Sequence, residues 1–219
     1  MLSVSRENFL KSIYKWVEAG ESKVLPVVLA KDMGLSKAAV SQMVKRMEEE
    51  GLVVYSRERG IEFSEKGYQL ALQVVRRHRL WELFLVEVLG YGWEEVHVEA
   101  ERLEHHSSDE LMNRIDTHLG HPSFDPHGYP IPDAGGRMPH APAVIPLAEA
   151  EVGKSYTVAR IQDENADLVL FLGKRDIAPG ETIVLLEGEP FEGLLKVRTK
   201  KGVYRLGTEA VEAVSLYVL

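Results

Sequence analysis

The sequence predicts a mainly α-helical protein that carries a small β domain at its C-terminal end. Three observations lead to this prediction. Apolar residues recur at helical spacing over most of the chain up to residue 120, and a stretch dense in Pro and Gly covers residues 121–146. Short β-rich runs then continue to the end of the sequence. We therefore expect three domains, at residues 1–74, 75–140 and 147–219.

The composition is that of an ordinary globular chain, because 45% of the 219 residues are hydrophobic and 27% are charged. The absence of cysteine excludes disulfide scaffolds, thiolate zinc fingers, iron–sulfur clusters and cysteine nucleophiles. No apolar run reaches the roughly 18 residues of a membrane-spanning helix. The N-terminus also lacks the apolar core of a signal peptide. We expect a cytoplasmic protein that makes no contact with a membrane.

Three helices are expected in the first domain. Apolar side chains recur at helical spacing from Phe9 to Val17, and Gly20 ends that run. A short second helix is expected to begin at Pro26, and Ser36 is placed to cap a third. Two helices joined by a tight Gly-containing turn, the second with small and polar residues near its start, form the helix-turn-helix pattern.

A short hairpin follows these helices. Residues 52–55 and 61–63 are β-rich, and a charged turn at residues 57–60 joins them, which is the pattern of the wing in a winged helix. The formal net charge is −8, yet residues 1–77 hold 13 Lys and Arg against 10 Asp and Glu. The wing and this local positive balance favour binding of double-stranded DNA over three amphipathic helices without a ligand.

The exposed face of the third helix and the wing supply the expected DNA contacts. The residues expected to face base edges are Ser36, Ala38 and Gln42, and those expected near phosphates are Lys37, Arg46, Arg57 and Arg59.

The second domain is expected to hold helices at residues 64–89 and 94–105 and a further one that begins at Ser107. On the first two of these helices, imidazoles and carboxylates recur at positions that share a face. A single His–Glu pair four residues apart is more often a solvated surface, but two such pairs on adjacent helices favour a metal site. The residues concerned are His78 and Glu82, His97 and Glu101, and then Glu104 and His105. The histidines without such spacing, which we expect on the surface or in loops, are His106, His118, His121, His127 and His140.

The third domain is expected to be a small barrel of the size of an SH3 domain, because its strands are short and evenly spaced. The expected strands are residues 155–161, 168–172, 182–186, 194–198, 203–206 and 213–218.

Four motifs resemble the metal-dependent transcriptional repressors of the diphtheria toxin repressor and manganese transport regulator family. They are, in order, LSKAAVSQMVKRMEEEGLV, RRHRLWELFL, VHVEAERLEHHSSDEL and HGYPIPD. The resemblance extends over the whole chain, since the last segment is similar to the family's SH3-like domain, which is related to the ferrous-transport accessory fold. It implies a homodimer that is not an enzyme, and that binds a palindromic DNA operator and controls metal-uptake genes when activated by Mn²⁺ or Fe²⁺.

The resemblance further implies two metal sites per subunit. The ancillary site would use His78, Glu82 and His97, with Glu164, Asn165 or Asp167 from the barrel. The activating site would use Glu101, Glu104 and His105, with Asn8 or Glu7 from the first helix. The sequence departs from both branches of the family, because Asn8 stands where iron-type members have Met and manganese-type members have Asp. Lys11 likewise replaces a further carboxylate of manganese-type members.

The ligand at residue 101 bears on the choice of metal. Iron-type members carry cysteine there and manganese-type members carry glutamate, so Glu101 favours Mn²⁺. Two other classes stay open on the residues alone. One is a winged-helix regulator that senses an organic ligand, and the other is a hydrolase with a His/Glu metal centre. The hydrolase is disfavoured because the sequence contains no HExxH-type signature and the helix-turn-helix would be left unexplained.

Overall fold

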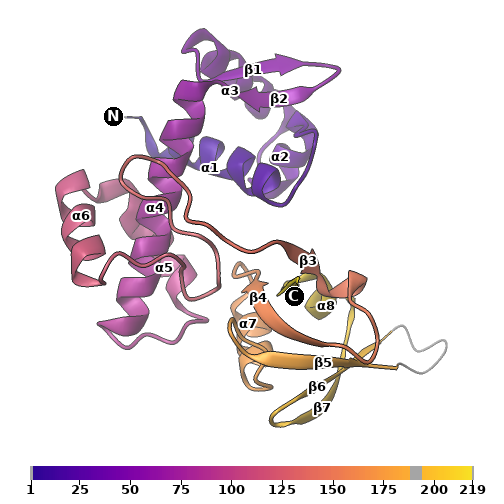
Figure 1. Ribbon diagram of the computed structural model, residues 1–219. Coiled ribbons are helices and arrows are strands. Elements are labelled where there is room, and N and C mark those ends of the chain that lie inside the picture. The colour runs from indigo at the N-terminus through magenta and orange to yellow at the C-terminus, as the bar shows by residue number, and fades with distance from the viewer. Residues whose placement is uncertain (1, 188–193, 219) are drawn as a thin grey trace. The chain divides into compact units, whose positions relative to one another are not determined.

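The computed structural model describes residues 2–187 and 194–218 (Figure 1). These residues form two compact units. The N-terminal unit comprises the chain up to His78 together with residues 104–108 and 132–137. The C-terminal unit comprises residues 79–103, 109–131 and the chain from Met138 onward. Within the described residues, no helix has the length and hydrophobicity needed to cross a lipid bilayer.

The N-terminal unit has the predicted winged helix-turn-helix fold (Figure 1). The Ser36 hydroxyl accepts a hydrogen bond from the Ala39 N–H at 3.1 Å, so Ser36 caps the third helix as predicted. The elements of the unit are α1 (Val4–Glu18), α2 (Pro26–Asp32), α3 (Lys37–Glu49), β1 (Val53–Ser56), β2 (Gly60–Phe63), the first part of α4 (Glu65–Glu87) and the 3₁₀ turn η1 (Glu104–His106).

The core of this unit is built from side chains that recur at helical spacing. Phe9, Leu10 and Ile13 on α1 are fully buried, as are Val40 and Met47 on α3. Burial of each such side chain contributes on the order of 1.5–3 kcal/mol relative to exposure. The opposite face of α3 is left exposed to solvent.

The wing is a two-stranded antiparallel hairpin in which Val53 lies opposite Phe63. It is joined to the segment before α2, because the Ile61 N–H donates to the Val24 carbonyl at 2.8 Å. Gly60 has a φ of 79°, and a Cβ there would overlap the Val24 carbonyl. Only glycine therefore fits at this end of the hairpin.

The C-terminal unit contains helices and the predicted SH3-like sheet. Its helices pack through a small core of Leu80, Leu83, Met112, Ile115 and Ile131. The sheet is antiparallel, with strand order β3-β8-β4-β5-β6-β7. The elements are the second part of α4, α5 (Val96–Leu103), α6 (Asp109–His118), β3 (Val144–Pro146), η2 (Leu147–Glu149), β4 (Ser155–Ile161), α7 (Ala166–Gly173), β5 (Thr182–Leu186), β6 (Leu195–Thr199), β7 (Gly202–Leu206), α8 (Thr208–Glu212) and β8 (Val214–Tyr217).

One predicted strand is wrong, because residues 168–172 lie in helix α7. The side chain of Asn165 caps this helix by accepting a hydrogen bond from the Leu168 N–H at 3.1 Å. Val169 and Leu172, three residues apart, are its fully buried positions. A short run of apolar residues has no clear period, so the cap and the burial decide between helix and strand.

The boundaries of several other elements also differ from the sequence prediction. The expected helix at residues 94–105 is α-helical only from Val96 to Leu103, and Glu104 and His105 lie in the tighter turn η1. The helix expected from Ser107 begins at Asp109. The last strand begins at Val214, since Ala213 ends the short helix α8.

Candidate metal centres and DNA-binding surface

The N-terminal unit buries a carboxylate in η1 among polar side chains from α1 and α4. The carboxylate of Glu104 is fully buried and accepts hydrogen bonds from Lys11 Nζ at 2.7 and 2.9 Å. It also lies 2.6 Å from His78 Nδ1. Burial alone would raise the pKa of Glu104, but the hydrogen bond with His78 and the charge of Lys11 hold it below its usual value. Glu104 is therefore a buried anion that depends on nearby cations.

A second carboxylate lies in the same unit. Glu7, on α1, is 2.6 Å from His105 Nδ1 and accepts a hydrogen bond from Arg77 at 2.9 Å. The other ring nitrogen of His105, Nε2, is buried and makes no hydrogen bond to the described residues, although it lies 3.1 Å from Glu104 Oε1. The buried Oδ1 of Asn8 also makes no hydrogen bond there. We call Glu7, Asn8, His78, Glu104 and His105 the N-terminal cluster.

The C-terminal unit holds a second set of buried imidazoles and carboxylates. Glu82 and His127 are fully buried, and His97 and Asp163 are partly buried. His97 Nδ1 lies 3.0 Å from Asp163 Oδ2 and 3.5 Å from Glu82 Oε1. His127 Nδ1 lies 3.7 Å from oxygens of both carboxylates. With the buried Asp125, these residues form what we call the C-terminal cluster.

His127 is held by contacts that direct Nδ1 to this cluster. Its Nε2 lies 2.8 Å from the Trp93 carbonyl, and the two rings are stacked with centroids 5.6 Å apart. Because a carbonyl only accepts, Nε2 carries a proton, so Nδ1 is the nitrogen that offers a lone pair once the ring has lost its other proton. The backbone of the same turn is tied to β4, since the Ile161 N–H donates to the His127 carbonyl at 3.0 Å. Asp163 follows that strand by two residues, so both segments reach the cluster together.

Electrostatics in the C-terminal cluster favour added positive charge. Burial lowers the pKa of His97, but the hydrogen bond to Asp163 and the nearby Glu82 outweigh it and raise the pKa to about 11. Burial likewise opposes charging of His127, yet Glu82 and Asp163 raise its pKa to about 9. Burial and the charge of Glu82 raise the pKa of Asp125 to about 7. The buried carboxylates thus draw protons to the cluster.

The donor atoms of the C-terminal cluster are spaced as a divalent metal ion requires. Ligand atoms from Glu82, Asp125 and His127 lie within 4.8 Å of one another. His127 Nδ1 and His105 Nε2 are buried nitrogens that make no hydrogen bond within the described chain. Carboxylate oxygens with imidazole nitrogens, and no thiolate, suit Mn²⁺ and Fe²⁺.

The structure brings together most of the site residues that the sequence indicated. Glu7, His78, Glu104 and His105 meet in the N-terminal unit, while Glu82 and His97 meet in the C-terminal unit. Asn8 follows Glu7 on α1, and its Oδ1 is buried. Glu101 also lies in the C-terminal unit, where its carboxylate is 3.7 Å from His97 Nε2.

A barrel residue that was not among the three expected, Asp163, lies 3.0 Å from His97 Nδ1. Glu164 and Asp167 are exposed, and Asn165 caps α7 and donates to Glu209. Asp125 and His127 were also missed, because they come from a turn without helical spacing. The Asp-Pro-His-Gly pattern at residues 125–128, within a segment otherwise poor in charge, was the available signal.

The turn that carries His127 gives a testable prediction. Gly128 has a φ of 88°, and a Cβ there would overlap the Ala159 carbonyl of β4. Gly128→Ala should therefore lower the free energy of unfolding by the cost of the left-handed backbone plus about 1–3 kcal/mol for the overlap. Gly153→Ala is the matched control, because Gly153 has a φ of 83° with nothing near its Cβ position. Equal losses in denaturant unfolding would contradict the proposed fit between the turn and β4.

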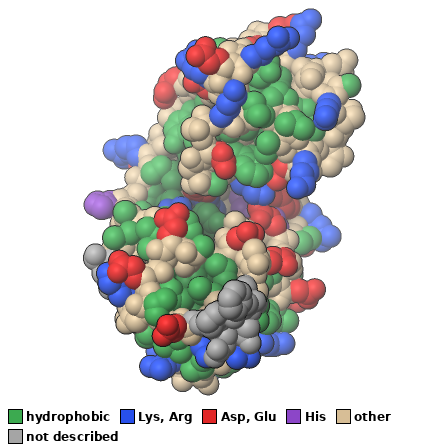
Figure 2. Space-filling view, turned by 90° about the vertical axis from the view of Figure 1, so that its right-hand side faces the viewer, with side chains coloured by type: hydrophobic (Ala, Val, Ile, Leu, Met, Phe, Trp, Pro, Cys, Tyr) green, Lys and Arg blue, Asp and Glu red, His purple; other side chains and the backbone are tan. Residues whose placement is uncertain are grey.

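The residues predicted to contact DNA all lie on the solvent-exposed surface of the N-terminal unit. Within the wing, Arg59 pairs with Glu62 at 3.3 Å. Lys23, in the segment before α2, donates from Nζ to the Arg57 carbonyl at 2.8 Å and so stabilises the tip of the wing. Figure 2 shows Lys and Arg side chains spread over the part of the surface that holds the N-terminal unit. The exposed residues are Ser36, Lys37, Ala38, Gln42, Arg46, Arg57 and Arg59.

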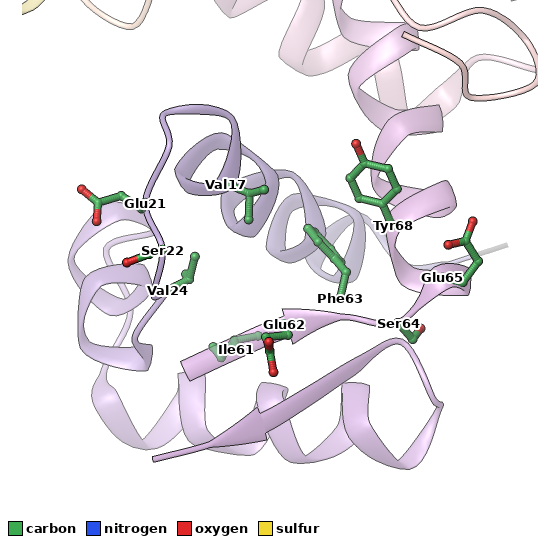
Figure 3. A pocket seen from close by; sticks show the side chains of 10 residues that line it. All are labelled: Val17, Glu21, Ser22, Val24, Ile61, Glu62, Phe63, Ser64, Glu65 and Tyr68. Carbon is green, nitrogen blue, oxygen red and sulfur yellow. The ribbon is translucent and has the colours of Figure 1, made fainter. Parts of the chain in front are cut away.

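A pocket of about 390 Å³ lies in the N-terminal unit between the end of α1, β2 and the start of α4 (Figure 3). Its walls are apolar at Val17, Val24 and Phe63. In Figure 3, the carboxylates of Glu21 and Glu65 point away from the space between Val17 and Phe63. The other lining residues with polar side-chain atoms are Ser22, Glu62, Ser64 and Tyr68.

Three family models match the chain. Residues 1–61 match the N-terminal DNA-binding domain of iron-dependent repressors, and residues 64–133 match their metal-binding and dimerisation domain. Residues 145–217 match the FeoA domain.

Known proteins give the same result. The iron-dependent repressor IdeR of Mycobacterium leprae is 35% identical over 191 residues, which cover 82% of each chain. IdeR of Mycobacterium tuberculosis is 43% identical over 126 residues, covering 58% of this chain and only 54% of the relative. The match thus spans about half the length of that relative.

Two solved structures resemble the chain along nearly its whole length. A manganese-dependent transcriptional repressor in complex with manganese is 37% identical, with a TM-score of 0.90, over 98% of this chain and all of that one. ScaR with bound Zn²⁺ is 32% identical, with a TM-score of 0.84, over 98% of this chain and 99% of that one. The chain therefore belongs to the family of metal-dependent transcriptional repressors that includes the diphtheria toxin repressor and the manganese-dependent repressors.

Proposed function

We propose that this protein is a homodimeric transcriptional repressor that binds a palindromic double-stranded DNA operator when Mn²⁺ or Fe²⁺ occupies its two buried clusters. The observation that carries the proposal is the N-terminal cluster. Its donors come from α1, α4 and η1, and they lie in the same compact unit as the winged helix-turn-helix. Metal-dependent control of metal-uptake genes in the cytoplasm is the function that this combination supports best.

The physical basis is a link between DNA-binding and metal-binding residues. Glu7 and Asn8 belong to α1, whose apolar face is part of the core that supports α3. Glu104 and His105 belong to η1, which continues from α5. A divalent ion supplies positive charge that buried carboxylates share. With an ion bound there, Glu104 and His105 would hold η1 against α1, and this would set the position of α3 relative to the dimer.

In a two-fold dimer, this arrangement would set the spacing between the two α3 helices. Recognition helices must reach successive major grooves about 34 Å apart, or a multiple of that distance. We further propose that the C-terminal cluster stabilises the same state without contacting the DNA-binding helices. Its role would be ancillary, because its donors belong to the C-terminal unit alone.

Binding stoichiometry tests the assignment of two sites. Equilibrium dialysis with Mn²⁺ should give two ions per chain, and sedimentation should show a dimer. His127→Ala should remove one ion and leave the other. Glu104→Gln should remove the other ion. Zero ions bound, or binding that neither variant changes, would contradict the proposal.

We further propose that Glu101, which lies outside both clusters as defined but 3.7 Å from His97 Nε2, is an added metal ligand that sets the choice of metal. A carboxylate is a hard ligand and favours Mn²⁺ relative to a thiolate, so we expect operator binding to be activated by Mn²⁺ with little discrimination against Fe²⁺. Glu101→Cys should shift the preference toward Fe²⁺, Co²⁺ or Zn²⁺. Anaerobic titrations of both proteins measure this, and an unchanged ranking of metals in the variant would show that Glu101 is not a ligand.

The two other candidate classes have less support. The family is one of repressors rather than enzymes. An organic effector is less favoured, because the pocket beside the wing has apolar walls at Val17, Val24 and Phe63 and the carboxylates of Glu21 and Glu65 point away from the space between Val17 and Phe63.

A further inference from the structure

The ammonium group of Lys11 contacts both oxygens of the buried Glu104. Its Nζ lies 2.7 Å from one oxygen and 2.9 Å from the other, so it sits across the carboxylate. Glu104 has no exposed side-chain surface, whereas 19% of the Lys11 side chain is exposed. Lys11 thus reaches the carboxylate from the edge of the unit, one turn along α1 from Glu7.

This contact compensates the negative charge that Glu104 buries in the N-terminal cluster. A buried carboxylate without a compensating cation is strongly disfavoured. Arg77 compensates Glu7 at 2.9 Å, and Lys11 compensates Glu104. Each anion of the cluster therefore has its own side-chain cation.

The same contact conflicts with the binding of a metal ion by Glu104. Two cations on one buried carboxylate repel each other strongly, because the surroundings screen charge poorly. Lysine is suited to leave, since its charge sits on a flexible four-carbon stem and is strongly hydrated in water. The exposed edge of the Lys11 side chain gives it a route to solvent.

We propose that Lys11 is a built-in competitor of the effector ion. Its ammonium neutralises Glu104 in the ion-free protein and must leave Glu104 before this carboxylate binds a divalent ion. Lys11 therefore raises the ion concentration at which the repressor becomes active and keeps the ion-free N-terminal unit folded. This inference rests on the proposed function and assigns part of its regulation to one residue.

The test compares Mn²⁺ affinity in variants that differ by one charge on α1. All proteins carry His127→Ala, so that the N-terminal cluster is the site titrated. Lys11→Met keeps the apolar stem and removes the charge, and it should lower the Kd for Mn²⁺ about tenfold, as expected for loss of one competing charge-assisted hydrogen bond. The melting temperature of its ion-free form should fall. Lys11→Arg should return the Kd to near the wild-type value.

Lys15→Met is the matched control. Lys15 lies on the same helix and pairs with Asp32 at 3.0 Å, and 45% of its side chain is exposed. Its removal changes the net charge equally without touching Glu104, so its Kd should stay within about twofold of wild type. If Lys11→Met fails to fold, Lys11→Gln gives the same comparison, because its neutral amide still donates to Glu104.

Two negative results have different meanings. A Kd for Lys11→Met or Lys11→Gln that is equal to or higher than that of Lys15→Met would overturn the role of Lys11 and leave the proposed function standing. A protein with an intact Lys11 that binds no Mn²⁺ at any concentration would overturn the proposed function and this inference with it.

Discussion

Glu104→Gln is expected to abolish metal-dependent DNA binding. The substitution keeps the shape of the side chain but removes the buried negative charge that lies beside His78 and His105. Since loss of even an outer partner of a metal ligand costs about 10–100-fold in affinity, loss of the ligand itself should cost at least about 100-fold. Mn²⁺ titration of operator binding measures the effect, with the operator obtained by selection from random double-stranded DNA.

Two variants serve as references for this result. Glu99→Gln removes a charge from α5, where Glu99 pairs with Arg102 at 3.0 Å, and it should respond to Mn²⁺ like the wild type. His97→Ala removes a residue of the C-terminal cluster and should weaken the response only in part. Equal losses in the Glu104 and His97 variants would refute the distinction between an activating and an ancillary site.

Gln42→Ala should relax the sequence preference of the protein for its operator. Gln42 lies exposed in the N-terminal half of α3, where an amide side chain can make paired hydrogen bonds to an adenine edge. We expect a loss of about 1–3 kcal/mol at one base position and almost no loss on random DNA. Competition binding with operators changed at single positions measures this.

Arg59→Ala on the wing is the counterpart to this variant. A phosphate contact is independent of sequence, so its loss should weaken binding to all DNA alike and reduce the slope of log affinity against log salt by about one. If both variants lose affinity equally for operator and random DNA, the assignment of base and phosphate contacts is wrong.

The fold could be predicted where local signals were strong. Gly20, Pro26 and Ser36 marked helix ends in the N-terminal unit, and the structure has these ends within two residues. The prediction failed at α7, where an apolar run is compatible with both helix and strand and only the Asn165 cap and burial decide.

The residues of the candidate sites could likewise be predicted only where a local sequence pattern marks them. His78, Glu82 and His97 could be found because helical spacing puts such residues on a shared face. Asp125, His127 and Asp163 could not, since they meet through hydrogen bonds between a turn and β4. Nor does any local pattern show that Lys11 contacts Glu104, which is 93 residues away in the sequence.

The central claim is that ion binding and DNA binding are coupled in one molecule. The most direct measurement is the affinity of the purified protein for its selected operator, in Mn²⁺ and again after a chelator has removed the ion. We predict that the chelator lowers operator affinity by about 100-fold or more and leaves weak binding to random DNA almost unchanged, which corresponds to a coupling free energy near the upper end of the usual range. Operator affinity that is the same with Mn²⁺ and with chelator would contradict the account.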